Sequence, residues 1–171
     1  NLLPRNAAVA LGGWIGLAAW SMLPKDRYRI DRHLKLTLKD QLTESERHQI
    51  GRRFFVNSGK NLVDIIRFRK QYTREIKPLI TVRGLEHFDS AYRAGKGVIG
   101  ITGHLGNFEL LVAHISALGY EVGVIGREQS DPRIDEWLVG QRAAAGLTNF
   151  SATGSPRRIL TWLKDGKVLG V

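Results

Sequence analysis

Two residues able to do acid–base chemistry stand five positions apart in a glycine-rich segment. His104 and Glu109 belong to the stretch GHLGNFE over 103–109, directly after an apolar run. A histidine that a carboxylate holds in one tautomer is the arrangement of a general base at neutral pH. In a helix, a spacing of five would place the side chains about 140° apart, so the pair needs a turn at His104 to meet. The alternative interpretation is a surface histidine at a strand end, with Glu109 favourable near a helix N-terminus.

The glycines of this segment bear on the same chemistry. Gly103 and Gly106 leave the backbone free to bend and let it approach a substrate closely. Backbone N–H groups at the start of the following helix are suited to bind an anion. We therefore expect Gly103 and Gly106 to lie in a binding site with His104.

The rest of the chain offers few further reactive groups. It has no cysteine, and therefore neither a thiolate metal ligand nor a cysteine nucleophile. It has no G-x-S-x-G elbow and no H-E-x-x-H spacing. His114 stands among apolar residues and is predicted to be a packing residue, whereas His33, His48 and His87 are predicted to be exposed. The sequence therefore predicts no metal site and no cofactor.

The apolar pattern after residue 80 predicts strands that alternate with helices. Strands are expected over 81–83, 98–102, 121–125, 148–151 and 167–171, and helices over 86–94, 108–118, 132–145 and 156–163. A longer helix over 44–69 begins at the capping-box pattern T-x-x-E of Thr43. This order predicts an α/β fold with a largely parallel sheet flanked by helices. Ligands of such sheets bind beyond the carboxyl ends of the strands, which is where His104 is expected.

The N-terminal segment over 7–23 carries no charged residue. A membrane-spanning helix needs about 20 apolar residues, with a range of roughly 17–25, so this segment is at the short end. Three interpretations are open: a short membrane anchor, a buried or monotopic helix, and a signal peptide. The positive-inside tendency of the flank that follows predicts a cytoplasmic location for the domain behind it. That flank contains Lys25, Arg27, Arg29, Arg32 and Lys35.

The positive charge is concentrated in the first half of the chain. Residues 1–80 carry 16 Lys and Arg against 7 Asp and Glu, whereas residues 81–171 carry 10 against 9. A basic half predicts an anionic partner, such as lipid headgroups, nucleic acid or an acidic protein. No recognised nucleic-acid motif is present, which favours the membrane surface over nucleic acid.

The segment VIGITGHLGNFELL over 98–111 resembles the signature of the bacterial lipid A biosynthesis acyltransferases of the lauroyl- and myristoyltransferase type. In that family, an apolar strand leads into T-G-H-aromatic-G-N-aromatic-E, and Leu105 departs from the usual aromatic residue. The resemblance continues in VRGLEH over 82–87, in VIGR over 124–127 and in LKDGKV over 163–168. That family lies within the wider lysophospholipid acyltransferase-like group.

The resemblance implies an acyltransferase that uses a His–Glu pair. His104 is expected to take the proton of an acceptor hydroxyl, and Glu109 to orient His104 and stabilise its charged form. The acceptor oxygen attacks the thioester of acyl carrier protein or acyl-CoA. Gly103, Gly106 and Asn107 are expected to bind substrate. Arg127 is the candidate for a substrate phosphate, because a guanidinium matches phosphate oxygens bidentately. The strand before Arg127 is expected to end beside the strand over 98–102, so that Arg127 faces the same groove as His104.

The resemblance leaves the acceptor open. A lipid A precursor is the first candidate, and a lysophospholipid or a phosphatidylinositol mannoside is the alternative. A non-enzymatic alternative is a basic module that binds membrane or nucleic acid. The predicted organisation is a hydrophobic anchor segment over 1–24, followed by a basic helical region and an acyltransferase domain over 25–171. Because Val171 lies inside an apolar run, we expect more sequence beyond it. The acyltransferase domain is expected on the cytoplasmic side of the inner membrane.

Overall fold

Two compact units make up the chain, comprising residues 1–64 and 65–171. The computed structural model describes residues 3–171, apart from the side chain of Arg69. The first unit contains α1 (Arg5–Met22), α2 (Pro24–Leu38), a 3-10 turn over Lys39–Gln41 and the beginning of α3 (Glu44–Gln71). The predicted boundary at residue 24 separates a membrane anchor from an acyltransferase domain by their functions, and it stays a prediction.

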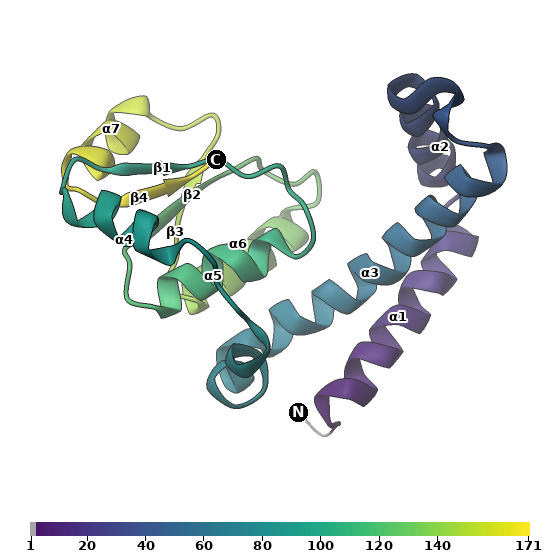
Figure 1. The fold of residues 1–171 in the computed structure, drawn as a ribbon, viewed down its shortest axis with the longest axis horizontal. Helices are drawn as coiled ribbons and strands as arrows, with labels where there is room; N and C mark the ends of the chain where they lie inside the picture. The colour runs from purple at the N-terminus through teal and green to yellow at the C-terminus, as the bar shows by residue number, and fades with distance from the viewer. Residues whose placement is uncertain (1–2) are drawn as a thin grey trace. The chain divides into compact units, whose positions relative to one another are not determined.

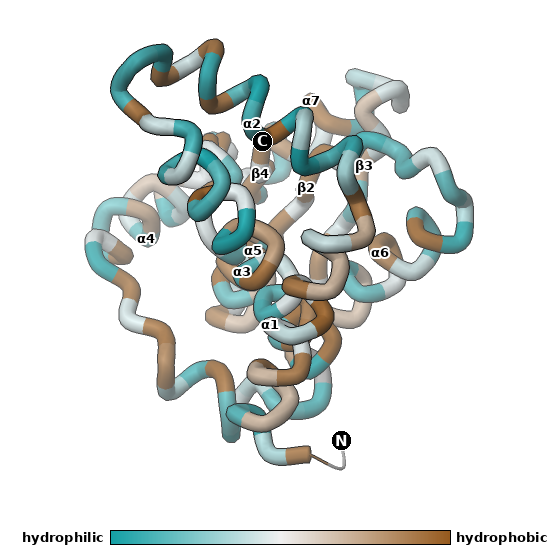
Figure 2. Tube along the Cα trace, turned by 90° about the vertical axis from the view of Figure 1, so that its right-hand side faces the viewer, coloured by the Kyte–Doolittle hydropathy of each residue, from teal (hydrophilic) through white to brown (hydrophobic). Residues whose placement is uncertain are grey.

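Pro24 separates the apolar first helix from the basic second one, a contrast that can be followed in Figure 2. Proline is favoured at the first position of a helix because it has no N–H to satisfy there. None of the helices described over 3–171 is by itself both long and apolar enough to cross a membrane. However, α1 together with Pro24–Gln41 meets that test as a pair bent by 89°.

The capping box predicted at Thr43 opens α3. The Thr43 backbone N–H donates to a Glu46 carboxylate oxygen at 2.7 Å, and the Glu46 backbone N–H donates to the Thr43 hydroxyl at 3.3 Å. These two bonds satisfy donors that a helix start otherwise leaves unpaired. The helix predicted over 44–69 is therefore confirmed, and it extends to Gln71.

Glycines bring α1 and α3 into backbone contact, as the neighbouring ribbons in Figure 1 show. A Cβ atom added to Gly12 would lie 2.6 Å from the Gly59 carbonyl oxygen. A Cβ on Gly16 would collide with the Phe55 carbonyl group, and one on Gly59 with that of Gly12. The two helices can therefore pack this closely only because these positions have no side chain.

The second unit is built on a parallel sheet, as predicted. Its strands are β1 (Val98–Gly100), β2 (Val122–Gly126), β3 (Thr148–Ser151) and β4 (Val168–Gly170). They pair in the order β1-β4-β2-β3, and every pairing is parallel. Although β1 is assigned only to Gly100, the Thr102 N–H donates to the Val171 carbonyl oxygen at 3.1 Å, so the pairing continues towards His104.

The strand predicted over 81–83 is wrong. These residues have no strand pairing. They lie between a 3-10 turn over Lys77–Leu79 and α4 (Leu85–Arg93), and Gly84 has a φ of 76°. This connection is short and ends in the left-handed turn at Gly84. It therefore has no residues left to pair with a neighbouring strand.

Helices cover both faces of this sheet. Val122 and Val124 of β2 point to one face and pack with residues of α4 and of α5 (Phe108–Ala117). Gly123, between them, faces the other side. There, Phe150 of β3 and Trp162 of α7 (Pro156–Lys164) occupy the space that a side chain at Gly123 would fill. The remaining helix of this unit, α6 (Pro132–Ala144), begins with Asp131 as its cap.

Candidate active site

His104 lies in the turn that leaves the carboxyl end of β1. Its φ is 55°, a left-handed conformation that few non-glycine residues adopt but in which histidine is several-fold enriched. The side chain is exposed, and its ring lies 4.5 Å from that of Phe108. The predicted turn at His104 is therefore confirmed, and it aims the imidazole away from the sheet and towards the start of α5.

The start of α5 is fixed by its own sequence. The Asn107 side-chain oxygen accepts a hydrogen bond from the Leu110 backbone N–H at 3.1 Å, which caps the helix. Gly106 has a φ of 62°, a conformation that glycine adopts without strain. Asn107, predicted to bind substrate, thus has a structural bond here, and Glu109 falls in the first turn of α5.

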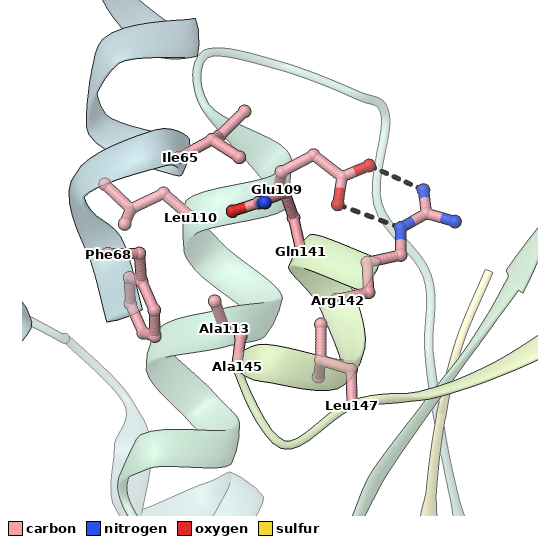
Figure 3. Close-up of a pocket in the computed structure, with 9 residues that line it drawn as sticks. All are labelled: Ile65, Phe68, Glu109, Leu110, Ala113, Gln141, Arg142, Ala145 and Leu147. Carbon is pink, nitrogen blue, oxygen red and sulfur yellow. Dashed lines mark hydrogen bonds and ion pairs between the residues drawn. The ribbon is translucent and has the colours of Figure 1, made fainter. Parts of the chain in front are cut away.

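Glu109 is held by Arg142 of α6. The Glu109 carboxylate accepts hydrogen bonds from Arg142 Nη2 at 2.5 Å and from Arg142 Nε at 3.1 Å, the two-point contact drawn in Figure 3. Both side chains are largely buried, at 13% and 14% exposed. The Arg142 Nη1 group also donates to the Asn149 side-chain oxygen at 2.7 Å. One guanidinium therefore joins α5, α6 and β3.

The direct His104–Glu109 hydrogen bond that we predicted is not formed. Among the residues described over 3–171, the Glu109 carboxylate bonds only to Arg142, and the His104 ring packs against the ring of Phe108. The reason is competition: a guanidinium offers a carboxylate two parallel donors, which a neutral imidazole does not. His104 and Glu109 nevertheless line the same pocket.

Arg142 is the residue that the sequence analysis missed. It stands 33 positions after Glu109, on a helix whose sequence gives no local sign of a buried cation. One indirect signal exists at Gly126, the last residue of β2. A Cβ atom there would lie 2.5 Å from Arg142 Nη1, so the glycine leaves room for the guanidinium.

An apolar pocket of about 250 Å³ opens beside His104 on the α5 face of the sheet. His104, Phe108 and Arg142 lie at its outer end, by the carboxyl ends of the strands. Phe88 and Val122 lie at its inner end, near where β2 begins. At about 3.3 Å per strand residue, the lining residues Val122 to Ile125 span about 10 Å along β2.

Arg127 follows β2 and is exposed. We expected the carboxyl end of β2 to lie beside that of β1, and this is wrong because β4 pairs between them. Arg127 is not among the residues that line the pocket at His104, although Ile125 is. The structure therefore brings together His104, Glu109 and Arg142, and leaves Arg127 at the rim, one strand further away.

His114 is a buried packing residue, as predicted. The Tyr72 hydroxyl lies 2.8 Å from His114 Nδ1, and the His114 side chain belongs to α5. Burial, and secondarily the positive charge of Lys77, lower the pKa of His114, while burial raises the pKa of Tyr72. The other three histidines of the sequence analysis are exposed. Within residues 3–171, no cluster of side chains suited to hold a metal ion is found.

A parallel α/β sheet with a histidine at the mouth of an apolar pocket is the framework of an enzyme that acts on an apolar substrate. Comparison with protein families is more specific: the model of the bacterial lipid A biosynthesis acyltransferases matches residues 1–171. The chain belongs to this family, which implies acyl transfer with a lipid acceptor. A search among curated proteins finds no significant match.

Proposed function

We propose that the protein is a membrane-associated O-acyltransferase that moves a fatty acyl group from a thioester to a hydroxyl of a phosphorylated glycolipid, a lipid A precursor. The observation that carries the proposal is the position of His104 at the mouth of an apolar pocket. Its neighbours Ile101 and Leu105 are 85% and 84% exposed, so the histidine stands on an apolar rim. Apolar surface around one basic group suits a lipid substrate.

His104 acts as the general base in this proposal. An imidazole nitrogen takes the proton of the acceptor hydroxyl while the oxygen attacks the thioester carbonyl carbon. The tetrahedral intermediate collapses, the carbon–sulfur bond breaks, and the thiolate leaves with the proton that His104 returns. The products are an ester and a free thiol, and no protein nucleophile is required, in keeping with a chain that has no cysteine.

Glu109 supplies a fixed negative charge to the same pocket. Because Arg142 lines the same pocket and offsets much of this charge, the imidazolium that forms on His104 is stabilised by the carboxylate end of a fixed ion pair. Arg142 holds that carboxylate on both oxygens, and is therefore the positioning residue of Glu109. Gly103 and Gly106 let the backbone of the turn approach the reacting groups.

The acyl chain of the donor occupies the pocket. Leu111, Val112 and Ile115 of α5 form one wall, facing Val124 of β2. The thioester carbon then lies at the outer end, by His104, and the carrier remains outside. Acyl carrier protein and acyl-CoA present the same phosphopantetheine thiol, so either donor fits this arrangement.

In this proposal, Arg127 binds a phosphate of the acceptor from its position just after the carboxyl end of β2. Its guanidinium has no hydrogen-bonding or ionic partner among the described residues, and it is exposed to an incoming headgroup. The proposed location is the cytoplasmic side of the inner membrane, because the apolar α1 is followed by the basic α2.

The test is acceptor-dependent release of thiol from acyl carrier protein or acyl-CoA. Purified protein is offered a lipid A precursor, a lysophospholipid or a phosphatidylinositol mannoside, and the acylated lipid is identified by mass spectrometry. Acylation of the lipid A precursor is expected. Acylation of only one of the other two acceptors would correct the substrate, and no acceptor-dependent release with any of them would overturn the proposal.

A further inference from the structure

The first unit exposes an apolar face along α1. Gly12, Gly13, Gly16 and Trp20 are buried against neighbouring helices. The opposite side of the helix is apolar and open to solvent, with exposed fractions of 50%, 70%, 59% and 76% for Leu11, Trp14, Ile15 and Met22. The spacing of these four residues places them on one helical stripe.

Two cations border this face in a groove between α1 and α3. Its apolar floor includes Gly13, Leu17 and Val56, with Trp14 at its edge, and Arg52 and Lys60 belong to its lining. The Lys60 chain lies over Gly13, where a Cβ atom would be 3.1 Å from Lys60 Cε. Among the described residues, neither cation has an acidic partner within ion-pair distance. An apolar floor with two free cations is complementary to a lipid that carries a phosphate.

The packing of α1 also determines how it can meet a bilayer. Gly12, Gly16 and Gly59 put α1 in backbone contact with α3. At the N-terminal end of α1, Arg5 donates to both carboxylate oxygens of Asp64, at 2.9 and 2.7 Å. If α1 spanned the bilayer, it would have to separate from α3 or carry α3 into the membrane. Each charged side chain of α3 at the bilayer centre would then cost about 2.5–3.5 kcal/mol of insertion free energy.

We propose that α1 lies in the plane of an anionic membrane surface instead of spanning the membrane. The face of Leu11, Trp14, Ile15 and Met22 enters the apolar region, and the groove takes a lipid phosphate on Arg52 and Lys60. An interfacial helix of this kind inserts about 5–10 Å below the headgroups. This inference rests on the membrane association in the proposed function, and it does not depend on acyl transfer.

Vesicle co-sedimentation of the full chain tests the face and the groove. Phosphatidylcholine vesicles with phosphatidylglycerol should bind the chain more tightly than phosphatidylcholine alone. Ile15→Glu should weaken binding about tenfold or more, because a charge replaces an isoleucine side chain that would enter the apolar region of the bilayer. The control Leu160→Glu, at an exposed leucine of α7, makes the same change outside the first unit and should change binding less than about twofold. Equal effects of the two substitutions would overturn the proposed face.

The groove is tested by removing its charges. Arg52→Gln and Lys60→Gln should each weaken binding to phosphatidylglycerol vesicles about fivefold and leave binding to phosphatidylcholine unchanged. Lys164→Gln removes one exposed charge from α7 and is the control, with an expected change below about twofold. If this control matched the groove variants, net charge alone would explain the binding and the groove would be excluded.

The orientation of α1 is tested with single cysteines, because the chain has none of its own. Asn6→Cys lies in the first turn of α1 and Lys25→Cys follows its other end, in the first turn of α2, and both residues are exposed. In sealed membrane vesicles of known orientation, a membrane-impermeant maleimide should label both from the same side. Labelling from opposite sides would show a spanning helix and overturn the proposal. His104→Asn should bind vesicles like the unchanged protein, so failure of acyl transfer and failure of this inference are separable.

Discussion

The Arg142 guanidinium of α6 holds both carboxylate oxygens of Glu109 of α5, and the two residues lie 33 positions apart in the sequence. Apolar side chains of α3, of α5 and of the segment that follows α6 line the pocket next to this pair, as Figure 3 shows. The low exposure of both side chains strengthens the ion pair, and removing one partner would leave the other charge buried and unpaired at a large cost in stability. Glu109 is therefore fixed by tertiary structure and not by the turn that carries His104.

The first prediction concerns this pair. Glu109→Gln or Arg142→Gln should each lower the free energy of unfolding by about 3–5 kcal/mol, because one charge is left without its partner. The double substitution should cost less than the sum of the two. Urea unfolding of the four proteins measures this coupling, and Arg133→Gln, which breaks the exposed pair with Asp131, should cost less than about 1 kcal/mol. Strictly additive effects would contradict the structural importance of the contact.

The second prediction concerns catalysis by His104. His104→Asn should lower acyl transfer by about 100- to 10,000-fold, the usual effect of a lost general base. Asparagine tolerates the left-handed backbone at this position, so unfolding by urea should be unchanged. His87→Asn, at an exposed histidine of α4, is the control. Turnover of the His104 variant within a few-fold of the unchanged protein would remove His104 from the mechanism.

The third prediction is a dependence of stability on pH. The pKa of His114 is lowered in the folded state, first by burial and then by Lys77. The unfolded chain therefore binds a proton more readily, and stability that is complete above about pH 6.5 is lost as the pH falls through the folded pKa. Urea unfolding at about pH 8 and about pH 5 should show this loss. The loss should shrink in His114→Gln, whose side-chain amide keeps a polar partner for the Tyr72 hydroxyl, and remain in His87→Gln. An unchanged loss in His114→Gln would assign it to other groups.

A fourth prediction compares two glycines inside helices. Gly59→Ala places a methyl group against the Gly12 carbonyl group and should cost about 1–3 kcal/mol or more through overpacking. Gly140→Ala in α6 meets nothing within 4 Å and should stabilise the chain by about 0.5–1 kcal/mol, because alanine loses less backbone entropy in a helix. Urea unfolding gives both signs. A stabilising Gly59→Ala would show that α1 and α3 are not in backbone contact.

The fifth prediction tests the proposed phosphate contact of Arg127. Arg127→Lys keeps the charge but loses the planar fork, so it should raise the KM for a phosphorylated acceptor, and Arg127→Ala should raise it more. The kcat should change little if the contact is equal in ground and transition states. An acceptor without that phosphate serves as the control. Equal damage with both acceptors would assign the contact to the donor or to structure.

Local patterns predicted the parts of the site that lie close together in the chain. An apolar run followed by Gly103 and His104 predicted a strand that ends in a turn, and Asn107 before Phe108 marked the start of α5. These features depend on neighbouring residues, whose preferences can be read from the sequence. They placed His104 at the carboxyl edge of the sheet, where it is found. The capping bond of Asn107, in contrast, was not predicted, because Asn107 was expected to bind substrate.

The partner of Glu109 and the order of the strands lay beyond such patterns. Arg142 reaches Glu109 only after α5 and α6 have packed, and no spacing rule joins residues of two helices. The position of β4 between β1 and β2 is likewise a property of the assembled sheet. A parallel alternation of strands and helices is compatible with several strand orders, so Arg127 was expected one strand too close to His104.

The strand order has a consequence for how the chain acquires its structure. Among the described strands, β1 pairs only with β4, whose first residue follows Val98 by 70 positions in the register Val98↔Val168. During synthesis, the strand that precedes His104 stays unpaired until β4 has left the ribosome, although β2 and β3 can already pair with each other. Contacts between distant segments form slowly because a long loop must close first. The reactive turn is therefore among the last parts of the sheet to be organised, and a nascent chain that stops before β4 would carry His104 without a framework to hold it.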